Sequence, residues 1–262
     1  MKSIYRHRCL ALAIAAASTQ VVPSAIAQGN SATALEEILV TARKRSESVQ
    51  DVPIAIDAID YERITQLDIV STADVARYTP ALTFDVGALP NDTRPSIRGV
   101  NAARGRPNVG ILVDFVDVSS EAMTVAGGGI TANMRLLDLE RVEVVKGPQS
   151  VLYGRGAFSG AVNYITRRPS QEFEGRVDGD YDEHGTYNLG LSVSGPLVED
   201  KLAGRLTLSS YDLSGWYDNP NTNSELGEGE SNGGSLALEW TPNEQFSAYL
   251  RAEYSEEEYA PR

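Results

Sequence analysis

The chain has 262 residues, of which 42% are hydrophobic, and this is enough for one or two globular domains. Its formal net charge is −13, and residues 171–262 alone hold 5 basic and 19 acidic residues, which argues against nucleic-acid binding because such proteins need basic patches. After the first 27 residues there is no run of 18 apolar residues, which excludes a helical membrane protein.

Residues 1–27 have the three parts of a cleavable signal peptide. A basic stretch is followed by a short apolar run at residues 10–17 and by the small-x-small cleavage site Ala25-Ile26-Ala27. A membrane-spanning helix is the alternative, but the apolar run is too short to cross a bilayer. We expect the mature chain to begin near Gln28. Because Cys9 is the only cysteine, that mature chain has no disulfide and no thiolate metal site.

Residues 28–49 begin with small polar residues and then contain a short β-prone run. The run consists of Glu37, Ile38, Leu39, Val40, Thr41 and Ala42. An isolated strand near a flexible end can add itself to the edge of another protein's sheet, because its backbone groups are unpaired. The same run also suits a first strand of the chain's own sheet, and composition does not separate these two interpretations.

Residues 50–170 combine short helices and strands in mixed order. The pattern predicts strands over 52–59, 109–118, 142–145 and 161–166, and helical segments over 61–67, 71–77, 136–140 and 150–153. Ser71 and Asp74 have the spacing of a capping box at the start of the second helix, which stops before Pro80. Many short elements in mixed order predict a compact α+β domain.

From Phe173 onward, apolar and polar side chains alternate strictly. Five segments follow this pattern, at 173–181, 187–193, 202–208, 236–240 and 246–254. An apolar face opposite a polar one is typical of membrane β-barrels with lipid outside and a wet lumen. The links 196–201 and 241–245 are short and 213–232 is long and polar, as bacterial barrels prefer. A soluble β-sandwich is the alternative.

The sequence predicts no catalytic residue, metal site or cofactor. Asp178–Asp182 resembles the start of a calcium loop, but Glu183 and Leu189 stand where that loop needs Gly and Glu. The glycines between 154 and 160 lack the Gly-Lys-Ser/Thr of a phosphate loop. His184 is the only histidine after the signal peptide, and no nucleophile–base pair can be assembled around it. We therefore expect that the protein is not an enzyme.

Several motifs, in order, resemble those of the TonB-dependent outer-membrane receptors. Glu37–Ala42 is similar to the TonB box, 52–56 to the opening strand of the plug, and Ile97-Arg98-Gly99-Val100 to an internal plug motif. Val113-Asp114-Phe115-Val116 stands where the family often has Val-Asp-Gly-Val. The most specific match runs from 139 to 149 and continues through 152–156 and 160–166.

This resemblance implies an α+β plug domain followed by antiparallel β-strands of an incomplete outer-membrane β-barrel. It assigns 1–27 to a signal peptide, 28–49 to a flexible segment with the TonB box, 50–170 to the plug, and 171–262 to about five barrel strands. Glu37–Ala42 would couple to the inner-membrane protein TonB by strand addition. Arg98, Gly99 and Arg155 would be plug-motif residues, with the two arginines pairing with carboxylates of the barrel wall.

The resemblance also implies energy-coupled uptake of a scarce solute, such as an iron–siderophore, across the outer membrane. Outer-membrane lipid, TonB and that solute would be the partners. A plugged barrel needs about 22 strands and roughly 600 residues, so we expect a fragment of a longer product or a truncated gene. The alternatives are a plug-only periplasmic binding protein and a non-functional remnant. The acidic 213–232 loop weakly disfavours a strongly anionic solute.

Overall fold

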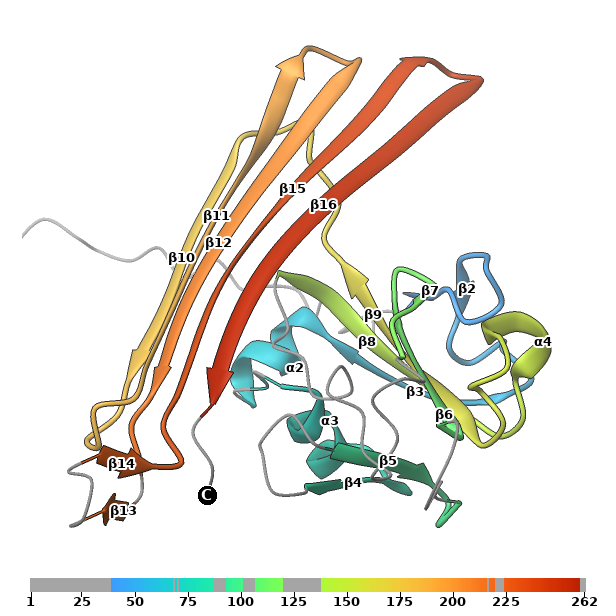
Figure 1. Cartoon of the computed structure of the whole chain (residues 1–262). Helices are drawn as coiled ribbons and strands as arrows, with labels where there is room; N and C mark the ends of the chain where they lie inside the picture. The colour runs from blue at the N-terminus through green and yellow to red at the C-terminus, as the bar shows by residue number, and fades with distance from the viewer. Residues whose placement is uncertain are drawn as a thin grey trace, which may run out of the picture. The chain divides into compact units, whose positions relative to one another are not determined.

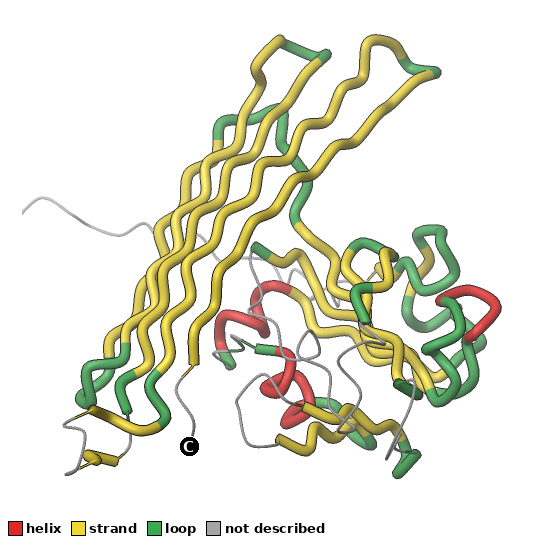
Figure 2. Tube along the Cα trace, viewed as in Figure 1, coloured by secondary structure: helices red, strands yellow, loops and turns green. Residues whose placement is uncertain are grey.

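The structure is a computed structural model that describes residues 39–67, 69, 71–86, 93–100, 107–119, 138–215, 217–219 and 224–259. The predicted signal peptide, together with Glu37 and Ile38, lies outside these residues. Within them, residues 39–166 form an α+β domain and the strands after residue 173 form a separate sheet (Figures 1 and 2).

The α+β domain is organised around a five-stranded mixed sheet. Its strands are β3 (Ala55–Asp60), β8 (Leu139–Lys146), β9 (Gly160–Thr166), β6 (Val109–Val113) and β7 (Val116–Asp117), in that spatial order. Only the β6–β9 pair is parallel. Strands β6 and β9 are buried almost throughout and are mainly apolar, whereas β8 has buried valines but also carries charged residues, among them the buried Glu143.

One face of this sheet is covered by two helices and a hairpin: α2 (Tyr61–Gln66), α3 (Thr72–Tyr78), β4 (Leu82–Val86) and β5 (Thr93–Ile97). Ile64 and Val75 of the helices pack with Val142, Val144 and Tyr164 of the sheet in one hydrophobic core. The helix starts are fixed by short side chains. Asp60 accepts the Arg63 N–H at 2.8 Å, and Asp74 accepts the Ser71 N–H at 3.0 Å, which confirms the predicted capping box.

The opposite face is covered by the N-terminal segment and a short helix. Strand β1 (Leu39–Val40) pairs with β2 (Glu47–Ser48), and α4 (Ser150–Tyr153) lies beside them (Figure 1). Ala42 packs there with Leu112, Val145 and Tyr153 in a second hydrophobic core. Residues 39–42 of the β-prone run therefore pack on the sheet and are not one of its strands.

The second sheet contains five long antiparallel strands in sequence order. They are β10 (Glu174–Tyr181), β11 (Tyr187–Val198), β12 (Leu202–Leu213), β15 (Gly229–Asn243) and β16 (Phe246–Tyr259). A small hairpin, β13 (Tyr217–Asn219) and β14 (Ser224–Leu226), lies in the long link. The predicted alternation is confirmed on β12, where Leu206 and Leu208 are exposed whereas Arg205 and Thr207, which alternate with them, are buried.

Three local predictions differ from the structure. Leu139 and Glu140 begin strand β8 instead of a helical turn, because the valine-rich run after them extends the ladder back to a Leu139–Thr166 pair. The predicted strand over 109–118 is a tight hairpin. Strand β5 was missed because Pro95 weakens the strand signal. A proline is tolerated in an edge strand, and β5 is one, because it pairs only with β4 in a two-stranded sheet.

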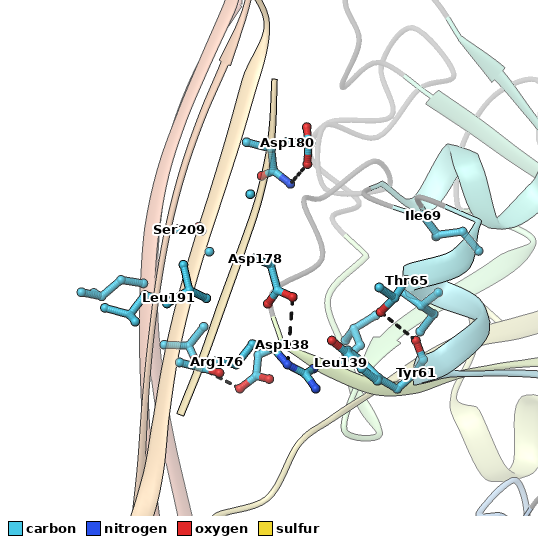
Figure 3. Close-up of a pocket in the computed structure, with 18 residues that line it drawn as sticks. Tyr61, Thr65, Ile69, Asp138, Leu139, Arg176, Asp178, Asp180, Leu191 and Ser209 are labelled. Carbon is cyan, nitrogen blue, oxygen red and sulfur yellow. Dashed lines mark hydrogen bonds and ion pairs between the residues drawn. The ribbon is translucent and has the colours of Figure 1, made fainter. Parts of the chain in front are cut away.

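A crevice of about 600 Å³ lies between helix α2 and the inner side of β10–β12 (Figure 3). Tyr61 and Thr65 line it from the helix, while Asp178, Asp180 and Ser209 line it from the strands. Its lining combines carboxylates and hydroxyls with apolar side chains, among them Ile64, Ile69 and Leu139.

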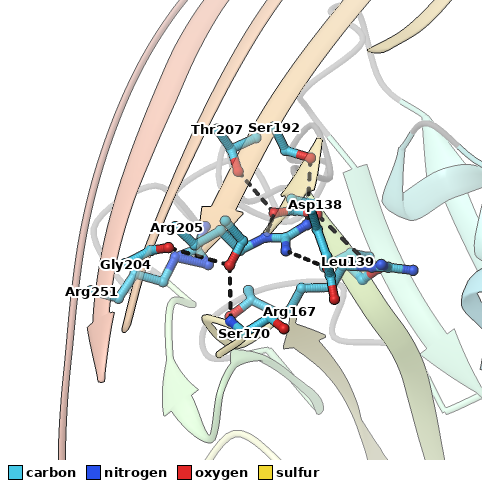
Figure 4. Close-up of polar contacts among 12 residues, drawn as sticks. Asp138, Leu139, Arg167, Ser170, Ser192, Gly204, Arg205, Thr207 and Arg251 are labelled. Atoms are coloured by element: carbon cyan, nitrogen blue, oxygen red, sulfur yellow. Dashed lines mark hydrogen bonds and ion pairs between the residues drawn. The ribbon is translucent and has the colours of Figure 1, made fainter. Parts of the chain in front are cut away.

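At one end of this crevice, Asp138 joins the α+β domain to the long-stranded sheet (Figure 4). Its carboxylate accepts hydrogen bonds from Arg205 Nη2 at 2.7 Å and from Thr207 Oγ1 at 2.8 Å. Arg205 also lies 3.4 Å from Ser192 Oγ and 3.6 Å from a Glu174 carboxylate oxygen. The Arg205 and Asp138 side chains are only 5% and 9% exposed, so this is a buried ion pair.

The segment between the two sheets adds further contacts. The Arg167 N–H donates to the Asp138 carbonyl at 3.0 Å, and the Ser170 N–H donates to Ser194 Oγ at 2.9 Å. The Arg168 guanidinium stacks over the Tyr249 ring at 4.3 Å. One hydrogen bond therefore holds the connecting segment to the α+β domain, and one hydrogen bond and one cation–π contact hold it to the strands of the second sheet.

Gly160 provides a test of the sheet packing. A Cβ at this position would overlap the Val145 carbonyl oxygen and lie 2.6 Å from Ile97 Cδ1. Gly160→Ala should therefore lower the free energy of unfolding by about 3 kcal/mol, as severe overpacking does. The measurement is urea unfolding followed by pulse proteolysis. Gly175→Ala is the control, because no atom lies within 4 Å of its added Cβ. Equal effects of the two substitutions would contradict this packing.

The Asp138–Arg205 pair provides a second test. Asp138→Ala leaves a buried guanidinium with only the half-exposed Glu174 as counter-ion, and should cost about 3 kcal/mol of stability. Thermal unfolding measures this loss. Asp180→Ala removes an exposed carboxylate from β10 and should change stability by less than about 0.5 kcal/mol. A wild-type melting temperature for Asp138→Ala would show that the pair does not hold the two sheets together.

Candidate functional site: the docked segment 39–42 and the contacts beneath it

Segment 39–42 is held on the sheet by a buried carboxylate. The Thr41 N–H and hydroxyl both donate to Glu143 Oε1, at 2.7 and 3.0 Å. Glu143 comes from the middle of β8 and is fully buried. Arg141 Nε donates to the same carboxylate oxygen at 2.8 Å, and its Nη2 reaches Thr41 Oγ1 at 3.1 Å. The charge of Glu143 is thus balanced within the contact.

A second attachment is made one residue further along. The Tyr153 hydroxyl donates to the Ala42 carbonyl at 2.6 Å. Burial, together with the nearby Glu143 carboxylate, raises the pKa of the Tyr153 hydroxyl well above its usual value. The hydroxyl therefore remains protonated and remains a donor under all physiological conditions.

The exposure of the segment alternates along its short length. Val40 and Ala42 are buried, while Leu39 is 51% exposed. In the described chain, β1 pairs only with β2, through Leu39–Ser48 and Val40–Glu47. Leu39–Val40 is therefore a strand of the chain's own structure, in a two-stranded ladder separate from the five-stranded sheet. Because the ladder has two strands, β1 also keeps one edge that no described strand occupies.

The predicted plug-motif residues lie in two turns. Arg98 has φ 55° and donates its N–H to the Ala81 carbonyl at 2.8 Å, and Gly99 follows with φ 74°. Arg155 follows Gly154, which has φ 89°. Both arginine side chains are exposed, and neither makes an ion pair with any carboxylate among the described residues. Their pairing with wall carboxylates stays a prediction.

The ion pair that the structure shows between the α+β domain and the second sheet has the reverse arrangement. Its carboxylate, Asp138, belongs to the domain, and its guanidinium, Arg205, belongs to a strand of the sheet. Asp138 and Arg205 are 67 residues apart, so no local pattern connects them. One signal was available. Arg205 occurs on the polar face of a strand whose neighbours on that face are Ala203 and Thr207, and a long cation among small residues needs a partner.

Tyr61, at the start of α2, is contacted by two guanidinium groups. Arg167 lies 3.9 Å and Arg176 4.1 Å from the ring centroid, the first from the connecting segment and the second from β10. Burial, with Arg176 nearby, lowers the pKa of the Arg167 side chain, although an arginine stays charged at physiological pH. The ring thus links the helix to both neighbouring segments through cation–π contacts.

The contacts of this site are hydrogen bonds, ion pairs and cation–π contacts. The described residues contain no group of three or more His, Cys, Asp or Glu side chains that would hold a metal ion. Among the described helices, none has the length and apolar character needed to cross a membrane. The site consists of a short, partly exposed strand held by a few directional contacts above β8, and β8 directly follows Asp138, which contacts the second sheet.

Comparison with known proteins identifies the domain. The family described as TonB-dependent Receptor Plug Domain matches residues 48–161. The pesticin receptor of Yersinia pestis is 27% identical over 212 residues, which are 79% of this chain and 30% of that receptor. The chain therefore spans about a third or less of the length of the relatives it matches.

Two solved structures share the fold. The ferric yersiniabactin uptake receptor FyuA from Yersinia pestis aligns with a TM-score of 0.69 at 24% identity, over 77% of this chain and 31% of that one. The pyoverdine outer membrane receptor FpvA from Pseudomonas aeruginosa PAO1 aligns with a TM-score of 0.70 at 22% identity, over 83% and 30%.

These matches confirm the predicted fold class, an α+β plug domain followed by antiparallel strands of a receptor barrel, of which the described strands form an open part. The α+β domain is hereafter called the plug, and the β10–β16 sheet the wall. Residues 48–161 match the plug domain of TonB-dependent receptors, and 79% of the chain is similar to the pesticin receptor.

Proposed function

We propose that this chain forms the N-terminal part of an energy-coupled outer-membrane receptor, in which segment 37–42 is the TonB box. The docked state of residues 39–42 supports this most directly. Leu39 is exposed and β1 keeps a free edge, so a partner strand can begin pairing there. The segment has few other contacts, and a force applied to its N-terminal end would break them one after another.

We propose that the transported solute is an iron–siderophore or a solute of similar size. FyuA is a ferric yersiniabactin uptake receptor and FpvA a pyoverdine receptor, which supports this class. The crevice of about 600 Å³ between α2 and β10–β12 is compatible with a path beside the plug. The domain limits proposed are 1–27 for the signal peptide, 28–49 for the coupling segment, 50–170 for the plug and 171–262 for the wall.

The outer membrane is the proposed location of the protein. The wall exposes leucines and aromatic residues on one face, among them Leu189, Leu191, Leu208, Trp240 and Leu250. A sheet with such a face is stable where lipid covers it and prone to associate in water. The opposite face carries small and polar residues and contacts the plug through Arg205 and Thr207.

Strand addition by TonB is tested with peptides, which separates TonB binding from docking on the plug. A peptide of residues 36–43 should bind the periplasmic domain of TonB. Val40→Pro removes a backbone donor and should weaken binding about tenfold or more, a loss of about 1.4 kcal/mol. Val40→Thr keeps the N–H and the β-branch and should bind as the parent does. Isothermal titration measures both, and equal affinities for the Pro and Thr peptides would exclude strand addition.

Location is tested by fractionating the native cell and probing with an antibody to residues 52–170. The proposal predicts one large, heat-modifiable band in the outer membrane, because closed barrels resist detergent until heated. A band at 28.3 kDa or slightly below in the soluble periplasm would contradict the transporter and favour a plug-only binding protein. Absence of any band would favour a non-functional remnant.

A further inference from the structure

The hairpin that joins β6 to β7 has an unusual residue at its tip. Val113 pairs with Val116, which leaves Asp114 and Phe115 as a two-residue turn with φ of 47° and 69°. Turns with two positive φ values favour Asp-Gly or Asn-Gly, since glycine adopts this backbone without a Cβ clash. Asp114 fits this rule, whereas Phe115 is a bulky residue in the left-handed region, where such residues are genuine outliers.

The turn is held in place by its surroundings. The Phe115 N–H donates to Asn163 Oδ1 at 3.1 Å. Asp114 accepts from the Thr166 N–H at 2.9 Å and from the Thr166 hydroxyl at 2.6 Å, and it donates its own N–H to the Tyr164 carbonyl at 2.9 Å. Four hydrogen bonds thus fix the backbone, so the unfavourable conformation at Phe115 is imposed. Imposed strain of this kind tends to occur at functional positions.

The Phe115 ring stacks against Tyr153, with ring centroids 6.2 Å apart and an angle of 19° between the planes. Tyr153 is the residue whose hydroxyl binds the Ala42 carbonyl. The two rings belong to the same hydrophobic core as Ala42. The stack therefore limits the directions in which Tyr153 can turn, and keeps its hydroxyl aimed at the segment.

The backbone of the same turn leads to the other attachment. Asn163, which accepts the Phe115 N–H, is the cross-strand partner of Glu143, and both are fully buried. Glu143 is the acceptor for Thr41. Phe115 is thus close to both side chains that hold the segment. Its ring contacts Tyr153, and its backbone N–H contacts Asn163, the cross-strand neighbour of Glu143.

We propose that Phe115 is a positioning residue for the coupling segment: by stacking on Tyr153 it keeps residues 41–42 docked and so sets the equilibrium between docked and released segment. The inference rests on the proposed function only in that TonB is the partner of the released form. A glycine at this position relaxes the turn but leaves Tyr153 without its stacking partner, so the hairpin becomes easier to form while the segment is released more often.

The test uses the full chain in lipid, with Leu39→Cys carrying a nitroxide label. Leu39 is half exposed, so the label does not disturb the core. Its electron paramagnetic resonance spectrum gives the ratio of mobile to immobile label. Phe115→Gly should raise this ratio about two- to tenfold, the range expected for loss of one aromatic pair. Tyr153→Phe, which keeps the stack but loses the hydroxyl, should also raise it.

Two controls separate positioning from general stability. Phe115→Tyr keeps an aromatic ring and should restore the immobile spectrum. Asp200→Gly relaxes another left-handed residue, with φ 55°, in the β11–β12 turn of the wall, and should leave the label unchanged. The urea midpoint of the plug should stay close to that of the parent in Phe115→Gly, because relief of the turn offsets the lost contact.

An immobile label in Phe115→Gly would overturn the proposal. So would mobility that appears only together with a lowered urea midpoint, because that would indicate a general loss of plug stability. A higher ratio of mobile to immobile label in both Phe115→Gly and Tyr153→Phe, at an unchanged urea midpoint, would support the proposal. The measurement contains no TonB, so failure of TonB to bind the 36–43 peptide would overturn the proposed function and leave this inference standing.

Discussion

A strand buried on both faces must pair the charges that it carries, and the rest of this structure depends on how β8 does so. Its carboxylate Glu143 lies on the face opposite α2 and is paired with Arg141 and with Thr41 of the coupling segment. Asp138, immediately before the strand, is paired with Arg205 of the wall. Burying such charges is costly unless each finds its partner. The same short stretch therefore requires both the docked segment and the contact with the wall.

The two attachments break in different ways. Undocking the segment breaks two hydrogen bonds to Glu143, one from Arg141 and one from Tyr153, after which water can solvate the freed backbone. Hydrogen bonds to charged groups contribute about 1.5–3 kcal/mol each and those to neutral groups about 1 kcal/mol, and these bonds can break one at a time. Separating Asp138 from Arg205 instead leaves a charge buried without a partner, at about 3–5 kcal/mol in a single step. Undocking can thus proceed in small steps while the plug stays bound to the wall.

Much of this architecture could be predicted from the sequence where one local pattern decides the outcome. The alternation after Phe173 predicted the five wall strands, and Ser71 with Asp74 predicted a helix start. The prediction failed where distant partners decide. The Asp138–Arg205 pair and the Glu143–Thr41 contact each join residues whose roles are visible only after folding. Arg98 and Arg155 were chosen by resemblance, and the structure describes them as exposed turn residues.

Seven non-glycine residues of the described chain have positive φ, and two of them lie at these attachments. Asp138 has φ 50° and binds the wall; Phe115 has φ 69° and stacks on the tyrosine that binds the segment. Others, such as Lys44 and Asp200, simply turn the chain. Positive φ alone is therefore a weak signal. It becomes informative when the same residue also makes a contact across a long sequence separation, because a local rule is then broken to serve a distant partner. On this reasoning, Phe115 takes a backbone conformation that a glycine would adopt more easily, and its ring in turn restricts Tyr153, which binds the Ala42 carbonyl.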